Sequence, residues 1–283
     1  MKHLLLAAAL SFSMLSAHAA DANYNVVPLP KSVVMVKGQP FNLTSATTIV
    51  YEGTNPEMKR NARFLSEYIQ QSTGIKTTLL DKRDKKAAAI VLVINPKVQG
   101  DEAYRLTVNN KQVTIAASTP AGVFYGIQTL RKSLPVQTNG ADITLPAVDI
   151  ADAPRFGYRG MMLDCGRHFF PVSFVKKFID ILAMHNMNVF HWHLTEDQGW
   201  RLEIKSHPEL TAKSSMRSGT VIGHNATVDD SIPHGGFYTQ QEARDIVEYA
   251  RQRHITVIPE IDMPGHTLAA LAAYPELGCT GGP

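Results

Sequence analysis

Cysteine, surplus charge and long apolar runs are all scarce in this sequence. Only two of its 283 residues are cysteine, Cys165 and Cys279, and they do not form a Cys-x-x-Cys pair. Neither a disulfide-dense scaffold nor a cysteine zinc site is therefore supported. The 28 basic and 25 acidic residues leave a net charge of +3, which provides no strong attraction to nucleic acid. Beyond the N-terminus no run approaches the roughly 20 apolar residues of a membrane span, so we expect no membrane anchor.

The first 19 residues have the features of an export signal. Lys2 precedes an apolar run, which passes through three serines before the triplet Ala-His-Ala at 17–19. A basic start, an apolar middle and an Ala-x-Ala site are typical of a cleavable signal peptide. The serines interrupt the run, which argues against a transmembrane anchor. We predict a mature chain that begins at Ala20 and works in the periplasm or outside the cell.

Residues 20–152 mix strand and helix patterns and predict a small α/β domain with sandwich-like layers. The β-branched run at 90–94 is typical of a buried strand. Runs at 104–108 and 113–116 flank Asn109-Asn110, and asparagine tolerates the positive φ of a tight turn, so these runs predict a hairpin.

Two helices are expected in the same domain. Asn55 and Pro56 open one apolar-periodic segment, and Gly74 closes it. Thr119 and Pro120 open the second in the same way. Proline suits the first helical position, and glycine suits the residue after the last turn. We find no catalytic constellation in this half of the chain.

Residues 153–283 alternate strand and helix patterns. Apolar runs at 160–163, 188–194 and 255–261 predict three strands. An amphipathic repeat at 175–182 predicts the first intervening helix, and the capping box at 239–242 opens the second. A βαβαβ order indicates parallel strands with right-handed crossovers. We predict the first three βα units of a TIM barrel, with a further helix starting near Thr267.

Ionisable side chains follow each predicted strand. Nine of the eleven histidines lie from His168 to His266. The candidate residues are Asp164, Arg167, His168, His191, His193, Glu196, Asp197, Glu260, Asp262 and His266. Because parallel α/β barrels build their sites from the loops after the strands, these side chains are expected to converge.

The histidines allow two interpretations. His191 and His193 are two positions apart, so they share one face of a strand. They could be a hydrogen-bonded core pair or ligands of a hydrolytic metal ion. A metal site needs a third ligand and an open position, for which His266 or Asp262 is available.

Arg167 and the tryptophans are also open to two interpretations. Arg167 could pair structurally with Asp164 or Glu196, or its planar fork of donors could grip adjacent sugar hydroxyls. Trp192 and Trp200 could lie in the core or stack on a pyranose ring.

Four ordered blocks carry a resemblance to a known family. The blocks are RGMMLDCGRHFFP at 159–171, NVFHWHLTEDQGWR at 188–201, GFYTQ at 236–240 and IPEIDMPGH at 258–266. They closely resemble the family 20 glycoside hydrolases, the β-N-acetylhexosaminidases. The resemblance runs from about Val26 to the last residue.

The resemblance implies removal of terminal N-acetylglucosamine or N-acetylgalactosamine with retention of configuration. The substrate's 2-acetamido carbonyl is the nucleophile, which makes this family an exception to the two-carboxylate scheme. Arg167 matches the arginine that holds hydroxyls of the terminal sugar. His266 matches a histidine that supports the general acid, and Glu196 with Asp197 occupies a further supporting position. No cofactor or metal is implied, and the expected partner is a glycan.

The family's Gly-Gly-Asp-Glu segment, which carries the acetamido-orienting Asp and the general acid, is absent from the 283 residues. We therefore expect an N-terminal portion of a longer enzyme, with an incomplete barrel and no turnover of its own. Because Cys165, at a strand end, has the features of a small buried residue, we also expect that in the longer protein Cys279 pairs with a cysteine beyond Pro283. The rival hypotheses are a metal-dependent hydrolase using His191, His193 and His266, and a sugar-binding homologue without catalysis.

Overall fold

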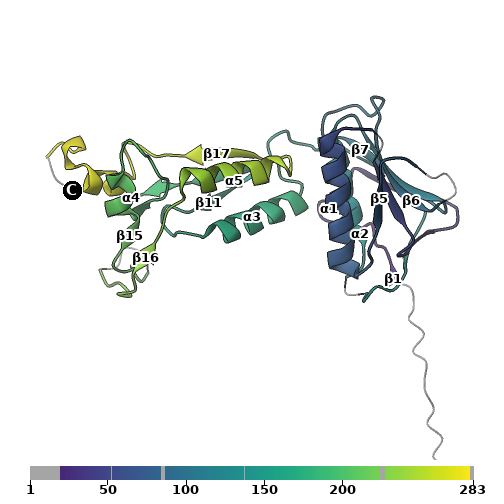
Figure 1. Cartoon of the computed structure of the whole chain (residues 1–283), viewed down its shortest axis with the longest axis horizontal. Helices are drawn as coiled ribbons and strands as arrows, with labels where there is room; N and C mark the ends of the chain where they lie inside the picture. The colour runs from purple at the N-terminus through teal and green to yellow at the C-terminus, as the bar shows by residue number, and fades with distance from the viewer. Residues whose placement is uncertain (1–19, 52, 84–86, 137, 224–226, 281–283) are drawn as a thin grey trace, which may run out of the picture.

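The computed structural model describes residues 20–51, 53–83, 87–136, 138–223 and 227–280. Figure 1 shows two units joined end to end, an N-terminal α/β unit and a second unit of strands and helices. The predicted export signal at 1–19 lies outside the described residues. No helix in the described part of the chain is long and apolar enough to cross a membrane.

A seven-stranded mixed sheet forms the N-terminal unit. Its order is β2 (Ser32–Met35), β10 (Val148–Asp152), β7 (Tyr104–Asn109), β8 (Gln112–Ala117), β6 (Ala89–Ile94), β4 (Thr48–Tyr51) and β5 (Thr78–Leu80). The neighbours from β8 to β5 are parallel, and those from β2 to β8 are antiparallel. A second sheet joins β1 (Ala20–Asp21), β9 (Ile143–Leu145) and β3 (Phe41–Leu43).

Both predicted helices of this unit are confirmed, and they cover one face of the seven-stranded sheet. Helix α1 (Pro56–Thr73) begins after Asn55, whose side chain accepts the Glu57 N–H, and ends at Gly74 with φ of 81°. Helix α2 (Pro120–Ser133) begins after Thr119, whose hydroxyl accepts the Gly122 N–H. The helices pack on each other and on the sheet, which gives the expected two-layer α/β arrangement.

The predicted hairpin is present, but its turn is stabilised differently from the prediction. Strands β7 and β8 pair antiparallel. Asn109 and Asn110 are not among the residues with positive φ. Instead, the Asn109 side chain accepts the N–H groups of Lys111 at 2.9 Å and Gln112 at 3.1 Å. Asparagine acts here through its amide oxygen rather than its backbone freedom.

The second unit has the predicted βαβαβ core. Strands β11 (Gly160–Asp164), β12 (Val189–His193) and β17 (Thr256–Glu260) form a parallel sheet in that order. Helices α3 (Val172–Met184) and α5 (Gln240–Arg251) pack on each other against one face, and α6 (Leu268–Ala273) follows β17. Helix α5 begins with the predicted capping box between Thr239 and Glu242.

A long excursion between β12 and α5 contains elements that the sequence patterns did not predict. It consists of a short hairpin of β13 (Thr195–Glu196) and β14 (Gly199–Trp200), helix α4 (Glu209–Ser214), and the paired strands β15 (Met216–Arg217) and β16 (His234–Gly235). A 3₁₀ turn, η1 (Pro275–Leu277), follows α6. The excursion returns to the strand ends, where its residues contact the loop after β11.

The three-stranded sheet is open, and no closed barrel forms within the described residues. Met162, His191 and Ile258 occupy one register level across it. Met162 is 47% exposed and Ile258 is 42% exposed, so this face has no covering layer. On the helix-covered face, Phe190 packs on Phe178 of α3, with ring centroids 5.6 Å apart.

Both tryptophans are core residues. Trp192 is 2% exposed and Trp200 is 5% exposed. Trp192 packs edge-on against Tyr238, whereas Trp200 lies in a smaller cluster with Leu210 of α4 and alanines of α6. The alternative in which one of them stacks on a sugar is not what the structure shows.

Several contacts join the units, among them that of Phe124 in α2 with His254. Glu102 of the first unit forms an ion pair with Arg159 at 2.8 Å and accepts a hydrogen bond from Asn188 at 3.1 Å. At the end of α5, the Arg253 guanidinium lies over the ring of Phe64 in α1. The two units are therefore packed together through helices α1 and α2 and the loop before β7.

Candidate active site

The strand register brings three ionisable side chains to one level. Asp164 pairs with His193, and His193 pairs with Glu260. All three end their strands, and neighbours at one level of a parallel sheet point to the same side. The predicted convergence after three different strands is therefore present for these residues.

Arg167 lies between two carboxylates. Its backbone N–H donates to Asp164 Oδ1 at 2.9 Å, and its Nη1 donates to Asp164 Oδ2 at 2.6 Å. Its Nη2 forms a close ion pair with Glu196 Oε1. The hydrogen bond that the Arg167 guanidinium donates to Asp164 is the main reason why the pKa of Arg167 is raised. The side chain is 48% exposed, so the guanidinium is fixed in position while still reachable from solvent.

Glu196 connects Arg167 to His266. The Glu196 side chain is only 1% exposed. Its Oε2 accepts the Asp197 N–H at 3.1 Å and lies 3.0 Å from His266 Nδ1. Arg167, Glu196 and His266 thus form one chain of polar contacts across the strand ends.

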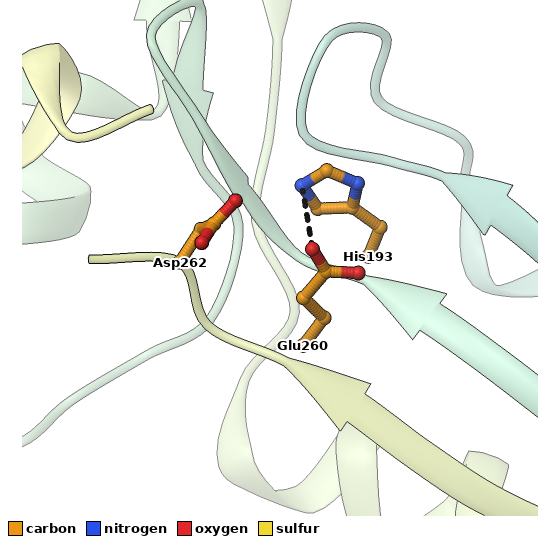
Figure 2. Close-up of side chains that lie close together, drawn as sticks. All are labelled: His193, Glu260 and Asp262. Atoms are coloured by element: carbon orange, nitrogen blue, oxygen red, sulfur yellow. Dashed lines mark ion pairs between the residues drawn. The ribbon is translucent and has the colours of Figure 1, made fainter. Parts of the chain in front are cut away.

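Figure 2 shows a second group, in which His193 and Glu260 point toward one another and Asp262 faces the same space. His193 Nε2 lies 3.8 Å from Glu260 Oε1 and donates to the Thr195 carbonyl at 2.8 Å. His191 contacts the other Glu260 oxygen. Glu260 therefore bridges the two histidines of β12.

Of the proposed metal ligands, His193 and His266 lie in different groups of possible ligands, and His191 lies in neither. Ligand atoms of His193, Glu260 and Asp262 lie within 4.8 Å of one another, as do those of Glu196, Asp197 and His266. Each group offers carboxylates and one imidazole, a donor set that suits a divalent cation. The trio of His191, His193 and His266 is not a group of this kind among the described residues.

Two predicted residues lie at the edge of the site. Asp197 Oδ1 accepts the Leu268 N–H at 3.1 Å, at the start of α6. The His168 ring stacks on His234, with centroids 3.8 Å apart, and His234 Nε2 accepts the Phe169 N–H at 3.0 Å. Burial, followed by the nearby His168, lowers the pKa of His234, which favours the neutral ring that this acceptor role requires.

Sequence patterns missed three residues that hold the loops around Arg167. They are Arg201, Arg217 and His234, all of which belong to the excursion. Within a polar stretch such residues have the pattern of a solvated loop. The sequence signal that could have pointed to these residues was the set of nearby glycines at 166, 199, 235 and 236.

The fold and the clustered side chains define an α/β protein whose site lies at the carboxyl ends of parallel strands. The chain belongs to glycosyl hydrolase family 20. Residues 156–282 match "Glycosyl hydrolase family 20, catalytic domain", and residues 23–153 match "Glycosyl hydrolase family 20, domain 2".

Named relatives agree with this assignment. The chain is 41% identical over 265 residues to "Beta-hexosaminidase" of Porphyromonas gingivalis, covering 92% of this chain and 33% of that protein. It is 36% identical to "Beta-N-acetylhexosaminidase" of Cellulomonas fimi, covering 91% of this chain and 50% of that protein. The solved GH20 β-N-acetylhexosaminidase of Streptomyces coelicolor A3(2) superposes with a TM-score of 0.79 at 38% identity, covering 91% of this chain and 50% of that one. The chain thus spans half or less of the length of these relatives.

Proposed function

We propose that the complete gene product removes terminal β-linked N-acetylglucosamine or N-acetylgalactosamine from glycans. The observation that carries the proposal is the half-exposed Arg167, held between Asp164 and Glu196 beside His266. A guanidinium has five N–H donors in a fixed plane, and the two carboxylates engage only part of them. The remaining donors suit adjacent hydroxyls of a terminal sugar.

The proposed reaction is substrate-assisted and retains anomeric configuration. The carbonyl oxygen of the 2-acetamido group attacks the anomeric carbon, and the glycosidic C–O bond breaks as the leaving oxygen takes a proton from a general acid. Water then adds to the anomeric carbon of the oxazolinium ion and gives a proton to the deprotonated general acid. The bond from that carbon to the acetamido oxygen breaks, which releases the sugar with the original configuration. In this scheme Arg167 binds the sugar. Glu196 and His266 keep the charged groups that surround the sugar in position.

The general acid and the acetamido-orienting Asp belong to a Gly-Gly-Asp-Glu segment that the 283 residues do not contain. A positioned general acid contributes about 10²- to 10⁴-fold to the rate. We therefore expect the 283-residue chain alone to show no robust turnover.

A pair of chromogenic substrates tests the proposed function. The complete gene product is expected to hydrolyse 4-nitrophenyl N-acetyl-β-glucosaminide and to leave 4-nitrophenyl β-glucoside untouched, because the second substrate has no acetamido nucleophile. Proton NMR of the first product is expected to show the β-anomer before mutarotation. Equal rates on both substrates, or an inverted product, would rule out the proposed mechanism.

Two groups of side chains in the site each combine carboxylates with a histidine. A metal-dependent hydrolysis is therefore a second hypothesis to test. The substrate-assisted reaction needs no metal, so activity is expected to survive a strong chelator unchanged. Activity that a chelator abolishes and one divalent metal restores would favour the metal hypothesis. Absence of Gly-Gly-Asp-Glu from the complete gene, together with binding of N-acetylglucosamine, would favour a sugar-binding homologue.

We also propose that the protein is exported, on the strength of the basic, apolar and Ala-x-Ala features of residues 1–19. N-terminal sequencing of the native protein is expected to start at Ala20. Recovery of the uncleaved N-terminus from the cytoplasm would contradict export.

A further inference from the structure

Arg201 is a buried cation whose hydrogen-bond partners are all backbone carbonyls. The side chain is 0% exposed. It forms no ion pair with a carboxylate among the described residues, whereas Arg167 and Arg253 both do. Burial is the main cause that lowers its pKa to about 10, and at neutral pH it is still charged. A buried charge is tolerated only where hydrogen bonds replace its hydration.

The guanidinium ties four separate segments together. Its Nε donates to Cys165 O at 3.1 Å, and its Nη2 donates to Gly166 O at 3.0 Å and Gln198 O at 3.2 Å. Its Nη1 donates to Ser215 O and, at 3.3 Å, to Gly236 O. These carbonyls come from the loop after β11, the β13–β14 hairpin, the residue before β15 and the residue after β16.

Glycines create the space that this arrangement needs. A Cβ on Gly199 would lie 2.2 Å from the Arg201 Cζ. A Cβ on Gly235 would lie 2.0 Å from Ser215 O, which is one of the carbonyls that Arg201 binds. Real Cβ atoms do not approach so closely, and the pinned, buried guanidinium has nowhere to move. The close packing is therefore specific for glycine at these positions.

The segment that leads into Arg167 is held on every side. The N–H groups of Cys165 and Gly166 both donate to His193 O, at 2.9 and 3.2 Å. Arg201 binds the carbonyls of the same two residues. The Arg167 carbonyl accepts from Arg217 Nη1 at 2.7 Å. The backbone that aims Arg167 is thus fixed from strand β12 on one side and from the excursion on the other.

We propose that Arg201 is a positioning residue, which holds the backbone of residues 165–167 so that the Arg167 guanidinium stays aligned between Asp164 and Glu196. The expected effect of Arg201 on sugar affinity rests on the proposed function of the site. The loop geometry itself does not depend on that function.

The fork of donors in arginine is the property that this role requires. Lysine keeps the positive charge but presents its donors from a single nitrogen. It therefore cannot reach the carbonyls of Gly166, Ser215 and Gln198 together. Arg201→Lys is expected to release at least one of the segments while leaving the site's net charge unchanged.

Steady-state kinetics of the complete gene product separate positioning from folding. For Arg201→Lys, KM for the N-acetylglucosaminide is expected to rise about 10- to 100-fold, the size of one or two lost charge-assisted hydrogen bonds. We expect kcat to change much less, because Arg201 touches no reacting atom. Gly199→Ala keeps Arg201 but displaces its guanidinium, so it is expected to raise KM in the same way.

Arg253→Lys is the matched control. Arg253 is also a buried arginine, 7% exposed, with its Nε 2.5 Å from Asp180 Oδ1 and its Nη1 donating to Tyr249 O at 3.1 Å. It lies near the junction of the units rather than at the strand ends. The control is expected to lower the melting temperature but to leave KM unchanged.

Hydrogen exchange measured by mass spectrometry tests the same proposal without activity. In Arg201→Lys, amides of residues 164–170, 215–217 and 235–238 are expected to exchange faster together, whereas Arg253→Lys leaves them protected. If the wild type does not hydrolyse the substrate, the proposed function fails, and exchange alone decides the role of Arg201. Unchanged KM or unchanged protection of residues 164–170 in a folded Arg201→Lys variant would overturn the proposal.

Discussion

His254 packs against Phe124 across the junction of the two units, with ring centroids 5.2 Å apart. Its Nε2 is buried and has no hydrogen-bond partner within the described ranges. Burial is the main cause that lowers the pKa of His254 from its usual 6.5 to about 4, and Glu57, Arg60, Arg251 and Glu102 also act on it. A titratable ring is therefore kept neutral at the interface.

Stability is expected to fall as pH falls from 6.5 to 4. In this window the unfolded chain binds a proton at His254 and the folded chain does not, so acid favours unfolding. Lowering the pKa of His254 from 6.5 to about 4 corresponds to about 3 kcal/mol in the free energy of unfolding. Urea denaturation at a series of pH values measures this loss. The stability associated with the neutral His254 ring is fully present above pH 6.5 and lost below pH 4.

His254→Asn is the matched variant for this experiment. The residue has φ of 58°, a conformation that asparagine adopts more readily than most residues. Carboxylates titrate in the same range, so the informative quantity is the difference between wild type and variant. That difference is expected to shrink on acidification; a difference that does not depend on pH would show that His254 has the same pKa in the folded and unfolded chains.

Glu102 is expected to couple the unfolding of the two units. Its carboxylate accepts from Arg159 and Asn188 of the second unit and from Tyr125 of α2. Glu102→Ala removes the acceptor of the Tyr125 hydroxyl and the ion-pair partner of Arg159, which costs about 1–3 kcal/mol. Differential scanning calorimetry is expected to show the single transition broaden or split in two.

The control for this coupling is Arg105→Gln. Arg105 pairs with Asp149 on the surface of the first unit, and its side chain is 58% exposed. Exposed ion pairs contribute about 0–1 kcal/mol, so the calorimetric transition is expected to stay single. Equal effects of the two substitutions would mean that Glu102 stabilises only its own unit.

The two cysteines are expected to differ in reactivity. Cys165 is fully buried and Cys279 is exposed, and neither is in a disulfide. Burial is the main cause that raises the pKa of the Cys165 thiol, and the thiolate is the reactive form. In the 283-residue chain a thiol reagent is expected to label one thiol quickly and the second only after unfolding.

The complete gene product allows a stricter thiol test. There we expect Cys279 to be paired with a later cysteine, because Cys165 is buried and Cys279 is exposed. Thiol counting on the oxidised, unfolded protein is expected to find Cys279 protected and Cys165 free. A free Cys279 would contradict the pairing.

Elements with local sequence signals were predictable. The caps at Asn55, Thr119 and Thr239 mark helix starts because one side chain satisfies nearby N–H groups. The three strands of the second unit follow from their apolar runs, of which that at 255–261 is rich in β-branched residues. Once those strands are parallel and adjacent, the meeting of Asp164, His193 and Glu260 at one edge follows from the chain order.

The excursion was not predictable by the same reasoning. Its strands have two residues each, too few for a periodicity. Its shape depends on Arg201, whose five acceptor carbonyls lie far from it in the sequence except for that of Gln198. A charged residue in a polar stretch is normally solvated. Only the three-dimensional arrangement shows that this one is buried.

Glu196→Gln is expected to weaken both stability and sugar binding. The carboxylate is 1% exposed and faces Arg167 on one oxygen and His266 on the other. The amide keeps the size of the side chain but removes the charge and puts an N–H₂ donor where one oxygen stood. Either Arg167 or His266 then faces a donor, so the free energy of unfolding is expected to fall by about 1–3 kcal/mol.

The expected kinetic result is a higher KM, because Arg167 keeps Asp164 as its only carboxylate partner in the described structure and is less firmly aligned. Glu209→Gln serves as the control, since Glu209 pairs with Lys213 at 3.2 Å with side chains 46% and 54% exposed. Such an exposed pair is expected to contribute less than about 1 kcal/mol and to leave KM unchanged. If Glu196→Gln matches this control in urea denaturation and in KM, Asp164 alone suffices to hold Arg167, and the contact with Glu196 has no part in aligning the sugar.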